Sequence, residues 1–336
     1  MPRFLIDTDT AGDDVTSLLI GLRWPGVHVE AVTVCAGNVE LDMCVRNALY
    51  TVEVAGRTEI PVHVGAERPL ERDLVTAHYV HGSDGMGESN FPPPTKPPDP
   101  TPASAAIVAA AAAHPGELEI VAQAPLTNIA LALREDPDLP SKVKRLWVMG
   151  GANNFVGNIT PAAEFNFYVD PEAAKVVVGA GFELTLVPWD VCVHDGVLST
   201  EELAPVIELD TELSRFYLDV NRAVARFMKE EHGIDGISHP DAIMMAMAID
   251  HGVIADSERC FVDVETGSDL TRGYSLVDKL KVVDRAVDNG VLVRQLMDVA
   301  SGEPNADVVL RADKRHFTEM LLSVLGQDVQ KQGAPN

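Results

Sequence analysis

Short runs of apolar, largely β-branched residues alternate along the first half of the chain with longer stretches in which apolar residues recur every three or four positions. The short runs predict strands covered on both faces, and the longer stretches predict helices with one buried face. The expected strands are Arg3–Ile6, Val29–Val34, Glu119–Ala122, Arg145–Met149 and Glu183–Val187. The expected helices are Val15–Leu22, Glu40–Val54, Ala103–Ala113, Leu126–Leu133 and Pro171–Val178.

The alternation of strands and helices favours an α/β fold with an open, mostly parallel, doubly wound (Rossmann-like) sheet and helices on both faces. The length of 336 residues fits one large α/β domain or two modest ones. We expect a single domain over residues 1–326. Residues 327–336 are polar and end in Gly-Ala-Pro-Asn, so we expect a disordered tail there.

Three later segments have patterns of their own. Apolar residues at helical spacing from Asp210 to Glu231 predict one long helix. Another helix is expected to begin near Pro240 and to run to Ile249, and because it is apolar on all sides it should be buried. Between residues 92 and 102, seven of eleven positions are proline, which excludes a helix and predicts an extended connector.

Composition narrows the range of partners. The chain carries 26 Lys and Arg against 51 Asp and Glu, so its formal net charge is −25. This balance argues against nucleic acid or an anionic membrane surface as the partner, because both need a basic face. No run approaches the roughly 18 apolar residues of a membrane span, and the first residues, MPRFLIDTDT, do not resemble a secretory signal. We therefore expect a cytoplasmic protein.

Four aspartates cluster where the first expected strand ends. Asp7 and Asp9 follow Phe4-Leu-Ile, and Asp13 and Asp14 open the next helix. In an open α/β sheet, ligands bind at the carboxyl ends of the strands. So many carboxylates repel one another unless a cation lies among them. Oxygen ligands favour a hard metal ion, so this motif predicts a Ca²⁺ or Mg²⁺ site.

Other interpretations of the acidic motif explain less of it. Helix capping accounts for one carboxylate of the four. An EF-hand loop needs an acidic residue at its twelfth position, where this chain has Leu18. An aspartyl-phosphate phosphatase has the motif Asp-x-Asp-x-Thr/Val after a strand, but Ala11 stands at the fifth position here. That class also leaves Asp13 and Asp14 without a role.

The motif Asp7-Thr-Asp-Thr-Ala-Gly-Asp-Asp14 resembles the N-terminal fingerprint Asp-x-Asp-x-Gly-x-Asp-Asp of the inosine–uridine-type nucleoside hydrolases, which are calcium-dependent N-ribohydrolases. Ala11 replaces the first glycine of that fingerprint. Further matches follow in the family's order over nearly the whole chain: Ala36-Gly-Asn38, His81-Gly-Ser-Asp-Gly85, Ala124-Pro-Leu-Thr-Asn128, Met149-Gly-Gly-Ala152, Gly157-Asn-Ile-Thr-Pro161, Ala163-Glu-Phe-Asn166, Asp170-Pro-Glu-Ala-Ala174, Pro240-Asp241, Val264-Glu-Thr266 and Thr271-Arg-Gly273.

The resemblance implies roles for particular residues. Asp9, Asp14 and Asp241 would bind Ca²⁺ through their carboxylates, and Thr127 through its backbone carbonyl. Two ribose hydroxyls and a water would complete a coordination number of about seven or eight, which is normal for calcium. Asp9 is also implied to be the general base that takes a proton from the metal-bound water. The implied sugar-binding residues are Asp13, Asn38, Met149, Asn158, Glu164 and Asn166.

Several of these residues also have a structural interpretation. Asn38 and Asn158 each follow a glycine and would fit a left-handed turn. Thr127 would fit the N-cap of a helix. Met149, at the end of an expected strand, would fit ordinary packing in the core. Asp7 is expected to orient the cluster without binding the metal itself.

The implied reaction is hydrolysis of the N-glycosidic bond of ribonucleosides to ribose and free base, through a transition state that resembles an oxocarbenium ion. The implied partners are a small-molecule ribonucleoside and further copies of the chain in a homodimer or homotetramer. In the residue that would activate the leaving base, this chain differs from part of the family. One branch of the family has a His directly before the metal-binding Asp, where this chain has Pro240, with His239 one residue earlier.

Base specificity and two alternative functions stay open. Another branch of the family stacks the base on aromatic side chains, for which Trp189 and Tyr217 are candidates, although both also fit a core. The roles of His81 and His239 are unassigned. One alternative is a Mg²⁺-dependent aspartyl-phosphate phosphatase with Asp7 as nucleophile. The other is a non-catalytic nucleoside-binding protein that has lost leaving-group activation.

Overall fold

The computed structural model describes residues 1–279 and 303–329, and its central element is a nine-stranded sheet. The strand order is β10-β9-β11-β6-β5-β4-β1-β2-β3. In the sheet, each strand is parallel to the next from β11 through β6, β5, β4, β1 and β2 to β3. Strand β9 is antiparallel to both β11 and β10. Their bounds are β1 Arg3–Thr8, β2 His28–Val34, β3 Val62–Val64, β4 Leu118–Gln123, β5 Arg145–Met149, β6 Leu184–Val187, β9 Ile254–Val264, β10 Ser275–Asp278 and β11 Ala306–Ala312.

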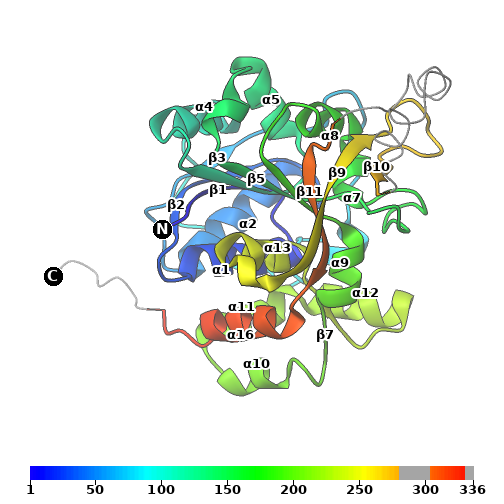
Figure 1. Ribbon diagram of the computed structural model, residues 1–336. Coiled ribbons are helices and arrows are strands. Elements are labelled where there is room, and N and C mark those ends of the chain that lie inside the picture. The colour runs from blue at the N-terminus through cyan, green and yellow to red at the C-terminus, as the bar shows by residue number, and fades with distance from the viewer. Residues whose placement is uncertain (280–302, 330–336) are drawn as a thin grey trace, which may run out of the picture.

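The predicted fold class is confirmed, because the sheet is open, mostly parallel and covered by helices on both faces (Figure 1). The five expected strands correspond to β1, β2, β4, β5 and β6, with ends that differ by at most two residues. The sequence analysis did not find the short strand β3 or the strands β9, β10 and β11. The last three form the mixed edge of the sheet, where long-range pairing rather than local pattern decides the structure.

Two groups of helices cover the sheet. On one face lie α1 (Gly12–Arg23), α2 (Leu41–Val54), α13 (Pro240–Ile249) and α16 (Lys314–Leu325) (Figure 1). On the other face lie α4 (Ala103–Ala113), α5 (Thr127–Glu135) and α8 (Pro171–Val178). The remaining elements are α3 His78–His81, α6 Leu139–Lys142, α7 Phe165–Val169, α9 Trp189–Asp195, α10 Ala204–Leu209, α11 Glu212–Val220, α12 Arg222–His232, the 3-10 helix His251–Val253, β7 Val197–Ser199 and β8 Gly236–Ser238.

Strand β1 shows how the apolar pattern produces the two layers. Phe4 and Ile6 belong to the core beneath α1 and α13, whereas Leu5 belongs to the core beneath α4 and α5. Alternate residues of a strand point to opposite faces, so a continuous apolar run supplies both cores. All three side chains are fully buried. The strand is thereby held between two helical layers, and its carboxyl end is fixed in place.

The prediction of one helix from Asp210 to Glu231 is wrong. Two helices, α11 and α12, occupy this segment and meet at Asn221. The Asn221 side chain donates from Nδ2 to the carbonyl of Tyr217 at 2.9 Å and to Oγ1 of Thr16 at 3.2 Å. An asparagine side chain that bonds to the backbone competes with helix continuation, and the apolar spacing alone does not reveal this competition.

Three other expectations concern the periphery and α13. Helix α13 begins at Pro240 and ends at Ile249, and its middle is buried on all sides, as predicted. The proline segment at residues 92–102 contains no helix and pairs with the sheet through one bridge between His63 and Asp99. Of the predicted tail, Gln327 and Asp328 accept hydrogen bonds from Arg23, and residues 330–336 lie outside the described residues. The single domain over residues 1–326 stays a prediction.

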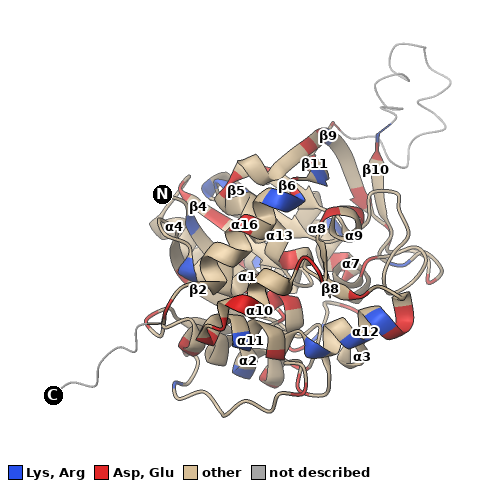
Figure 2. Ribbon diagram, turned by 90° about the horizontal axis from the view of Figure 1, so that it is seen from below, with Lys and Arg blue, Asp and Glu red and all other residues tan. Residues whose placement is uncertain are grey.

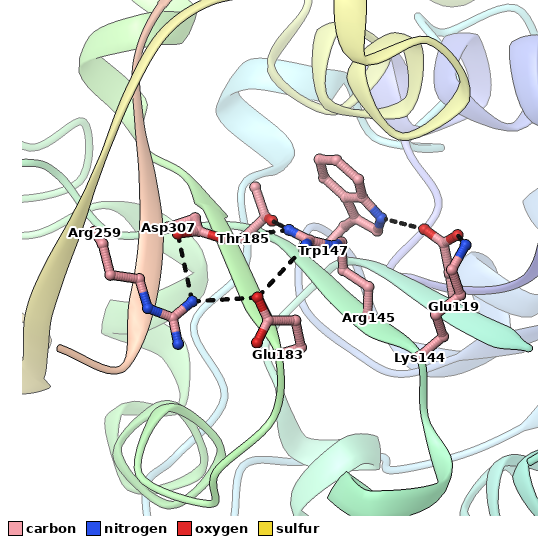
Figure 3. Close-up of polar contacts among 8 residues, drawn as sticks. All are labelled: Glu119, Lys144, Arg145, Trp147, Glu183, Thr185, Arg259 and Asp307. Carbon is pink, nitrogen blue, oxygen red and sulfur yellow. Dashed lines mark hydrogen bonds and ion pairs between the residues drawn. The ribbon is translucent and has the colours of Figure 1, made fainter. Parts of the chain in front are cut away.

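The amino ends of the central strands carry a network of charged and polar side chains (Figure 3). Glu119 accepts from Nε1 of Trp147 at 2.8 Å and from Nζ of Lys144 at 2.7 Å. A second group joins β5, β6, β9 and β11 through paired charges. Its members are Arg145, Glu183, Thr185, Arg259 and Asp307. At this end of the sheet, charged and polar side chains therefore bond to one another, and a second cavity borders Arg3, Glu119 and Lys144.

Acidic residues are spread over many surface elements, among them α10 and α12, with basic residues between them (Figure 2). This distribution agrees with the formal net charge of −25 and forms no basic face in that view. None of the helices at residues 1–279 and 303–329 has the length and hydropathy that a bilayer crossing needs.

Candidate active site

A cavity of about 360 Å³ opens at the carboxyl ends of the central strands. It lies near the point where the order of strands reverses between β1 and β4, which is where ligands bind in open α/β sheets. Helices α1 and α13 pack against each other beside it. The residues that line it include seven of the predicted site residues: Asp13, Asn38, Met149, Asn158, Glu164, Asn166 and Asp241.

Three carboxylates come together at the inner end of the cavity. Asp13, Asp14 and Asp241 are buried, and one oxygen from each lies within 4.8 Å of the others. Asp13 and Asp14 stand in the first turn of α1, and Asp241 in the first turn of α13. The backbone N–H of Asp241 donates to Oδ2 of Asp13 at 3.4 Å. The packing of two helix starts therefore joins acidic residues that are more than two hundred positions apart in the sequence.

Asn38 connects Asp9 to this cluster. Its backbone N–H donates to Oδ2 of Asp9 at 2.7 Å, and its side-chain Nδ2 donates to Oδ2 of Asp14 at 2.9 Å. The preceding residue must be glycine, because a Cβ atom on Gly37 would lie 2.1 Å from Oδ2 of Asp9. Asn38 has no positive φ, so its interpretation as a left-handed turn residue is wrong. The position of Asn38 is set instead by its hydrogen bonds to the carboxylates of Asp9 and Asp14.

Asp14 is held by further hydrogen bonds from neighbouring strands. Thr8 donates to Oδ1 of Asp14 at 2.7 Å, and Nε2 of Gln123 donates to the same oxygen at 3.1 Å. The backbone N–H of Ala11 donates to Oδ2 at 3.2 Å. Ala11 has φ −142°, an extended conformation open to any residue, which explains how alanine replaces the glycine of the family fingerprint. Sequence reasoning missed Gln123, whose only signal is a polar residue ending an apolar strand.

Burial raises the pKa of every carboxyl group in this cluster. The pKa of Asp13 rises to about 7, through burial first and the charge of Asp14 second. The pKa values of Asp9 and Asp241 rise well above the usual range, through burial and then through the charges of Asp14 and Asp13 respectively. Burial also raises the pKa of Asp14. A cation among these groups would offset both the repulsion and the loss of hydration.

Asp7 is fully buried in β1 and does not line the cavity. Its Oδ1 accepts hydrogen bonds from Thr33 at 2.6 Å and from Asn128 at 2.8 Å. Burial raises its pKa to about 7. Thr33 lies on β2, and Asn128 lies on α5, which follows β4. Both β2 and β4 are neighbours of β1 in the sheet. Asp7 therefore ties neighbouring strands together behind the site, and this position does not suit a nucleophile that must reach a substrate.

Glu164 and Asn166 lie on the opposite wall of the cavity. Both stand at the start of α7, where Glu164 is the N-cap and accepts from the backbone N–H of Asn166 at 2.8 Å. Glu164 also accepts from the N–H of Gly151 at 2.8 Å, and burial raises its pKa to about 7. Nδ2 of Asn166 donates to the carbonyl of Met149 at 3.2 Å. A turn at the helix start, not an extended segment, brings these polar groups to one side.

The remaining predicted residues occupy different positions. Asn158 is exposed on the loop between β5 and α7, and it has no positive φ, so a left-handed turn is wrong for it too. Thr127 is buried at the first position of α5, directly after the loop that follows β4. The N-cap of α5 is Leu126, and the Thr127 hydroxyl donates to Oδ2 of Asp170 at 2.6 Å. Metal binding by the Thr127 carbonyl stays a prediction.

The outer part of the cavity has an apolar wall that sequence analysis missed. Trp189, one of the two candidates for stacking on the base, lines it, whereas the other candidate, Tyr217, does not. Phe227 and Met228 also line it, and both lie in the segment from Asp210 to Glu231 for which only a helix was predicted. Two buried polar atoms in the lining, Nδ1 of His81 and Oγ of Ser238, have no hydrogen-bond partner within residues 1–279 and 303–329. Other lining residues of this wall are Tyr79, Phe155, Val156, Val193, Val197, Val224 and Ile234.

His81 also explains a glycine in the acidic motif. A Cβ atom on Gly12 would lie 2.5 Å from Nδ1 of His81, so the first residue of α1 must lack a side chain. The backbone N–H of Gly12 donates to the carbonyl of Gly85 at 3.0 Å. The segment that contains His81 is thereby packed against the start of α1. Burial lowers the pKa of His81 to about 4.

His239 and Tyr217 lie in the core and are absent from the cavity lining. His239 is fully buried and contacts Tyr217 and the carbonyl of Gly196. Pro240, which directly precedes Asp241, lines the cavity in the place where one family branch has its histidine. The shift of one residue therefore turns the imidazole away from the site.

Comparison with known proteins agrees with this geometry. The family model described as inosine-uridine preferring nucleoside hydrolase matches residues 4–319. A protein of Schizosaccharomyces pombe is 36% identical over 279 residues, which cover 82% of this chain and 89% of the relative. The pyrimidine-specific ribonucleoside hydrolase RihA of Citrobacter koseri is 33% identical over 324 residues, covering 94% and 96% of the two chains.

Solved structures give the same result. A plant nucleoside hydrolase, PpNRh1, superposes with a TM-score of 0.87 at 28% identity and covers 97% of this chain and 99% of its own. An inosine-guanosine nucleoside hydrolase superposes with a TM-score of 0.84 at 28% identity, with the same coverage. The acidic cluster, the order of motifs and these relatives together show that the chain belongs to the inosine–uridine preferring nucleoside hydrolase family, a family of enzymes.

Proposed function

We propose that this protein hydrolyses the N-glycosidic bond of ribonucleosides and that Ca²⁺ is its metal ion. The observation that carries the proposal is a single cavity with two chemically different parts. Its inner part combines carboxylates with amide groups, which suit a sugar with several hydroxyls. Its outer part is apolar and aromatic, which suits a planar base.

The acidic cluster fits a calcium ion by its donor set. Its ligands are all oxygen, which favours a hard cation. Oδ1 of Asp9 is buried and, within the described part of the chain, has no hydrogen-bond partner. We propose that Asp9, Asp14 and Asp241 hold the ion together with the Thr127 carbonyl, and the geometry adds Asp13 as a further candidate. When bound, calcium would grip the sugar diol and polarise the attacking water.

The chain's own residues supply the remaining chemistry. Asp9 is fully buried and is not among the residues that line the cavity, but its hydrogen bond from Asn38 engages Oδ2, which leaves Oδ1 as the proposed acceptor of the proton of the attacking water. Glu164 and Asn166 face the other side of the sugar, where negative charge and amide dipoles stabilise the positive charge that develops on the ring. The apolar side chains that line the outer part of the cavity lower the local polarity around a bound substrate, which strengthens these interactions.

The phosphatase alternative finds less support in the geometry. Its nucleophile would be Asp7, which is as fully buried as Asp9. Oδ1 of Asp7 accepts from Thr33 and Asn128, whereas Asp9 is joined through Asn38 to the acidic cluster. The alternative of a non-catalytic nucleoside binder depends on how the leaving base is activated. His239 cannot protonate the base from its position in the core, because both its ring nitrogens are already hydrogen-bonded.

A single assay separates these functions. The purified protein is incubated with inosine, uridine and p-nitrophenyl riboside in the presence of Ca²⁺, and free ribose is measured. Release of ribose from a nucleoside supports the proposal, and exhaustive chelation should abolish it. The same assay run with p-nitrophenyl phosphate and Mg²⁺ tests the phosphatase, which phosphate release there without ribose release from the ribosides would favour. Binding of nucleosides with no release from any riboside would favour the non-catalytic protein. Light scattering on the same sample tests the proposed homodimer or homotetramer.

A further inference from the structure

Ser238 is a buried serine that the sequence analysis did not single out and the proposed mechanism does not use. It is the last residue of β8, its exposed fraction is 5%, and it lines the cavity. Its Oγ atom has no hydrogen-bond partner among residues 1–279 and 303–329. Buried hydroxyl groups almost always have such a partner in folded proteins. The partner of this buried hydroxyl therefore comes from outside the chain, as a bound water or a ligand atom.

The position of Ser238 is fixed by backbone pairing. Strands β7 and β8 are antiparallel, and Ser238 pairs directly with Val197, another lining residue. The backbone N–H of His239 donates to the carbonyl of Gly196 at 3.0 Å. Strand β8 also packs beside α12, which contributes Phe227 to the cavity (Figure 2). Because the pairing holds the backbone on both sides of Ser238, its Cα–Cβ bond keeps its direction, and only the rotamer of the hydroxyl group can change.

Ser238 belongs to the outer, apolar part of the cavity. Val197 lies across the hairpin from it, and Ile234 precedes it in the same lining segment. The carboxylates and amides of the inner part come instead from the starts of α1, α7 and α13 and from the loop after β2. A hydroxyl among apolar side chains can orient a bound ligand through a hydrogen bond, which apolar contacts alone do not do. Because its cross-strand neighbour in the lining is Val197, this position favours contact with the base over contact with the sugar, although Asp241 follows three residues later.

We propose that Ser238 determines base specificity by forming a hydrogen bond with a carbonyl oxygen or ring nitrogen of the nucleobase. This inference rests on the proposed function. A hydroxyl both donates and accepts, so it pairs with either kind of heteroatom. Trp189 and Phe227 supply apolar surface for the base, but they do not distinguish one heteroatom from another. A site that leaves its own buried polar group unpaired rejects a ligand that lacks the matching atom.

The test compares Ser238→Ala with Ser238→Thr, which keeps the hydroxyl and suits a strand. The matched control is Ser199→Ala, because Ser199 lies on the partner strand β7, is absent from the cavity lining and bonds locally to Glu202. Each variant is assayed with inosine, uridine and p-nitrophenyl riboside, whose aryl ring has neither ring nitrogen nor carbonyl. Competitive inhibition by free ribose reports on the sugar end. Thermal unfolding of each variant reports on the fold.

We expect Ser238→Ala to lower kcat/KM for at least one nucleoside by about 3- to 10-fold, the usual effect of one neutral hydrogen bond. Hydrolysis of p-nitrophenyl riboside and inhibition by ribose should not change, and Ser238→Thr should restore most of the loss. Equal losses on all substrates, or no loss on either nucleoside, would overturn the inference. If the wild type releases no ribose, the proposed function fails separately. Calorimetric binding of the same nucleosides to Ser238→Ala then still decides the role of Ser238.

Discussion

Nε2 of His239 lies 2.6 Å from the hydroxyl of Tyr217, with the two rings stacked at 5.8 Å between centroids and 6° between planes. Nδ1 of His239 lies 3.0 Å from the carbonyl of Gly196, which can only accept. Nδ1 therefore carries the proton, and Nε2 accepts from Tyr217. Burial lowers the pKa of His239 to about 4, which agrees with a neutral ring. The pair is a buried polar contact that supports the start of α13.

The first prediction concerns this contact. Tyr217→Phe removes the donor and leaves Nε2 of His239 buried and unpaired, so the free energy of unfolding should fall by about 1–3 kcal/mol. The kcat/KM for nucleosides should stay within about twofold of the wild type, since neither ring lines the cavity. Denaturant unfolding and steady-state kinetics measure the two quantities. A large loss of kcat at unchanged stability would show that the pair takes part in the reaction.

The second prediction separates Asp7, which lies on β1, from Asp9, which directly follows that strand. Asp9→Asn keeps the size of the side chain but removes the proton acceptor, so kcat should fall by about 10²- to 10⁴-fold. Asp7→Asn should have a much smaller effect on kcat, because Asp7 lies behind the site and contacts Thr33 and Asn128. Ribose release with inosine or uridine provides the measurement. The reverse order of effects would favour Asp7 as a nucleophile.

The third prediction concerns the close approach at Gly37. A Cβ atom there would lie 2.1 Å from Oδ2 of Asp9, so Gly37→Ala must displace the carboxylate or the backbone of Asn38. A displacement near 1 Å lowers catalytic rates by about 100-fold, and calcium affinity should fall with it. Gly267→Ala is the control, because its Cβ would meet only the flexible Glu265 side chain at 3.2 Å on an exposed turn. Calcium titration and kcat/KM should change in the first variant alone.

The fourth prediction concerns stability and pH without metal. Burial raises the pKa of Asp13 to about 7 in the folded state, against about 4 in an unfolded chain. Between these two pKa values the folded state therefore binds more protons than the unfolded state. The free energy of unfolding consequently falls as the pH rises from about 4 to about 7, because Asp13 must ionise in a buried position. Asp13→Asn avoids this cost. In chelator, the variant should be more stable than the wild type at pH 8, with a difference that disappears as the pH falls toward 4.

Thermal unfolding of both proteins across this pH range provides the measurement. Taking the difference between wild type and variant removes the contribution of the buried histidines, which titrate in the opposite direction. Added calcium should narrow the difference at pH 8, because a cation offsets the repulsion between Asp13 and Asp14. A wild type that is more stable than Asp13→Asn at pH 8 in chelator would contradict the raised pKa.

Local sequence determined those parts of the molecule whose cause is local. The apolar run Phe4-Leu-Ile supplies both cores whatever follows it, and the spacing of Asp7, Asp9, Asp13 and Asp14 places acids at a strand end and a helix start. The fold class and the family could therefore be predicted. The sequence also predicted the buried helix from Pro240 to Ile249, because its apolar composition has no other satisfactory environment.

Only the tertiary structure decided the features that depend on contacts between distant segments. It turns His239 into the core, brings Gln123 to Asp14, and interrupts the expected long helix where Asn221 reaches Thr16. It also leaves the Ser238 hydroxyl unpaired in the cavity wall. Each of these outcomes depends on which element packs opposite a side chain. Residue type and spacing do not show which element packs opposite a side chain. The same polar residue can form hydrogen bonds within the core, cap a helix or bind a ligand, according to the residues around it.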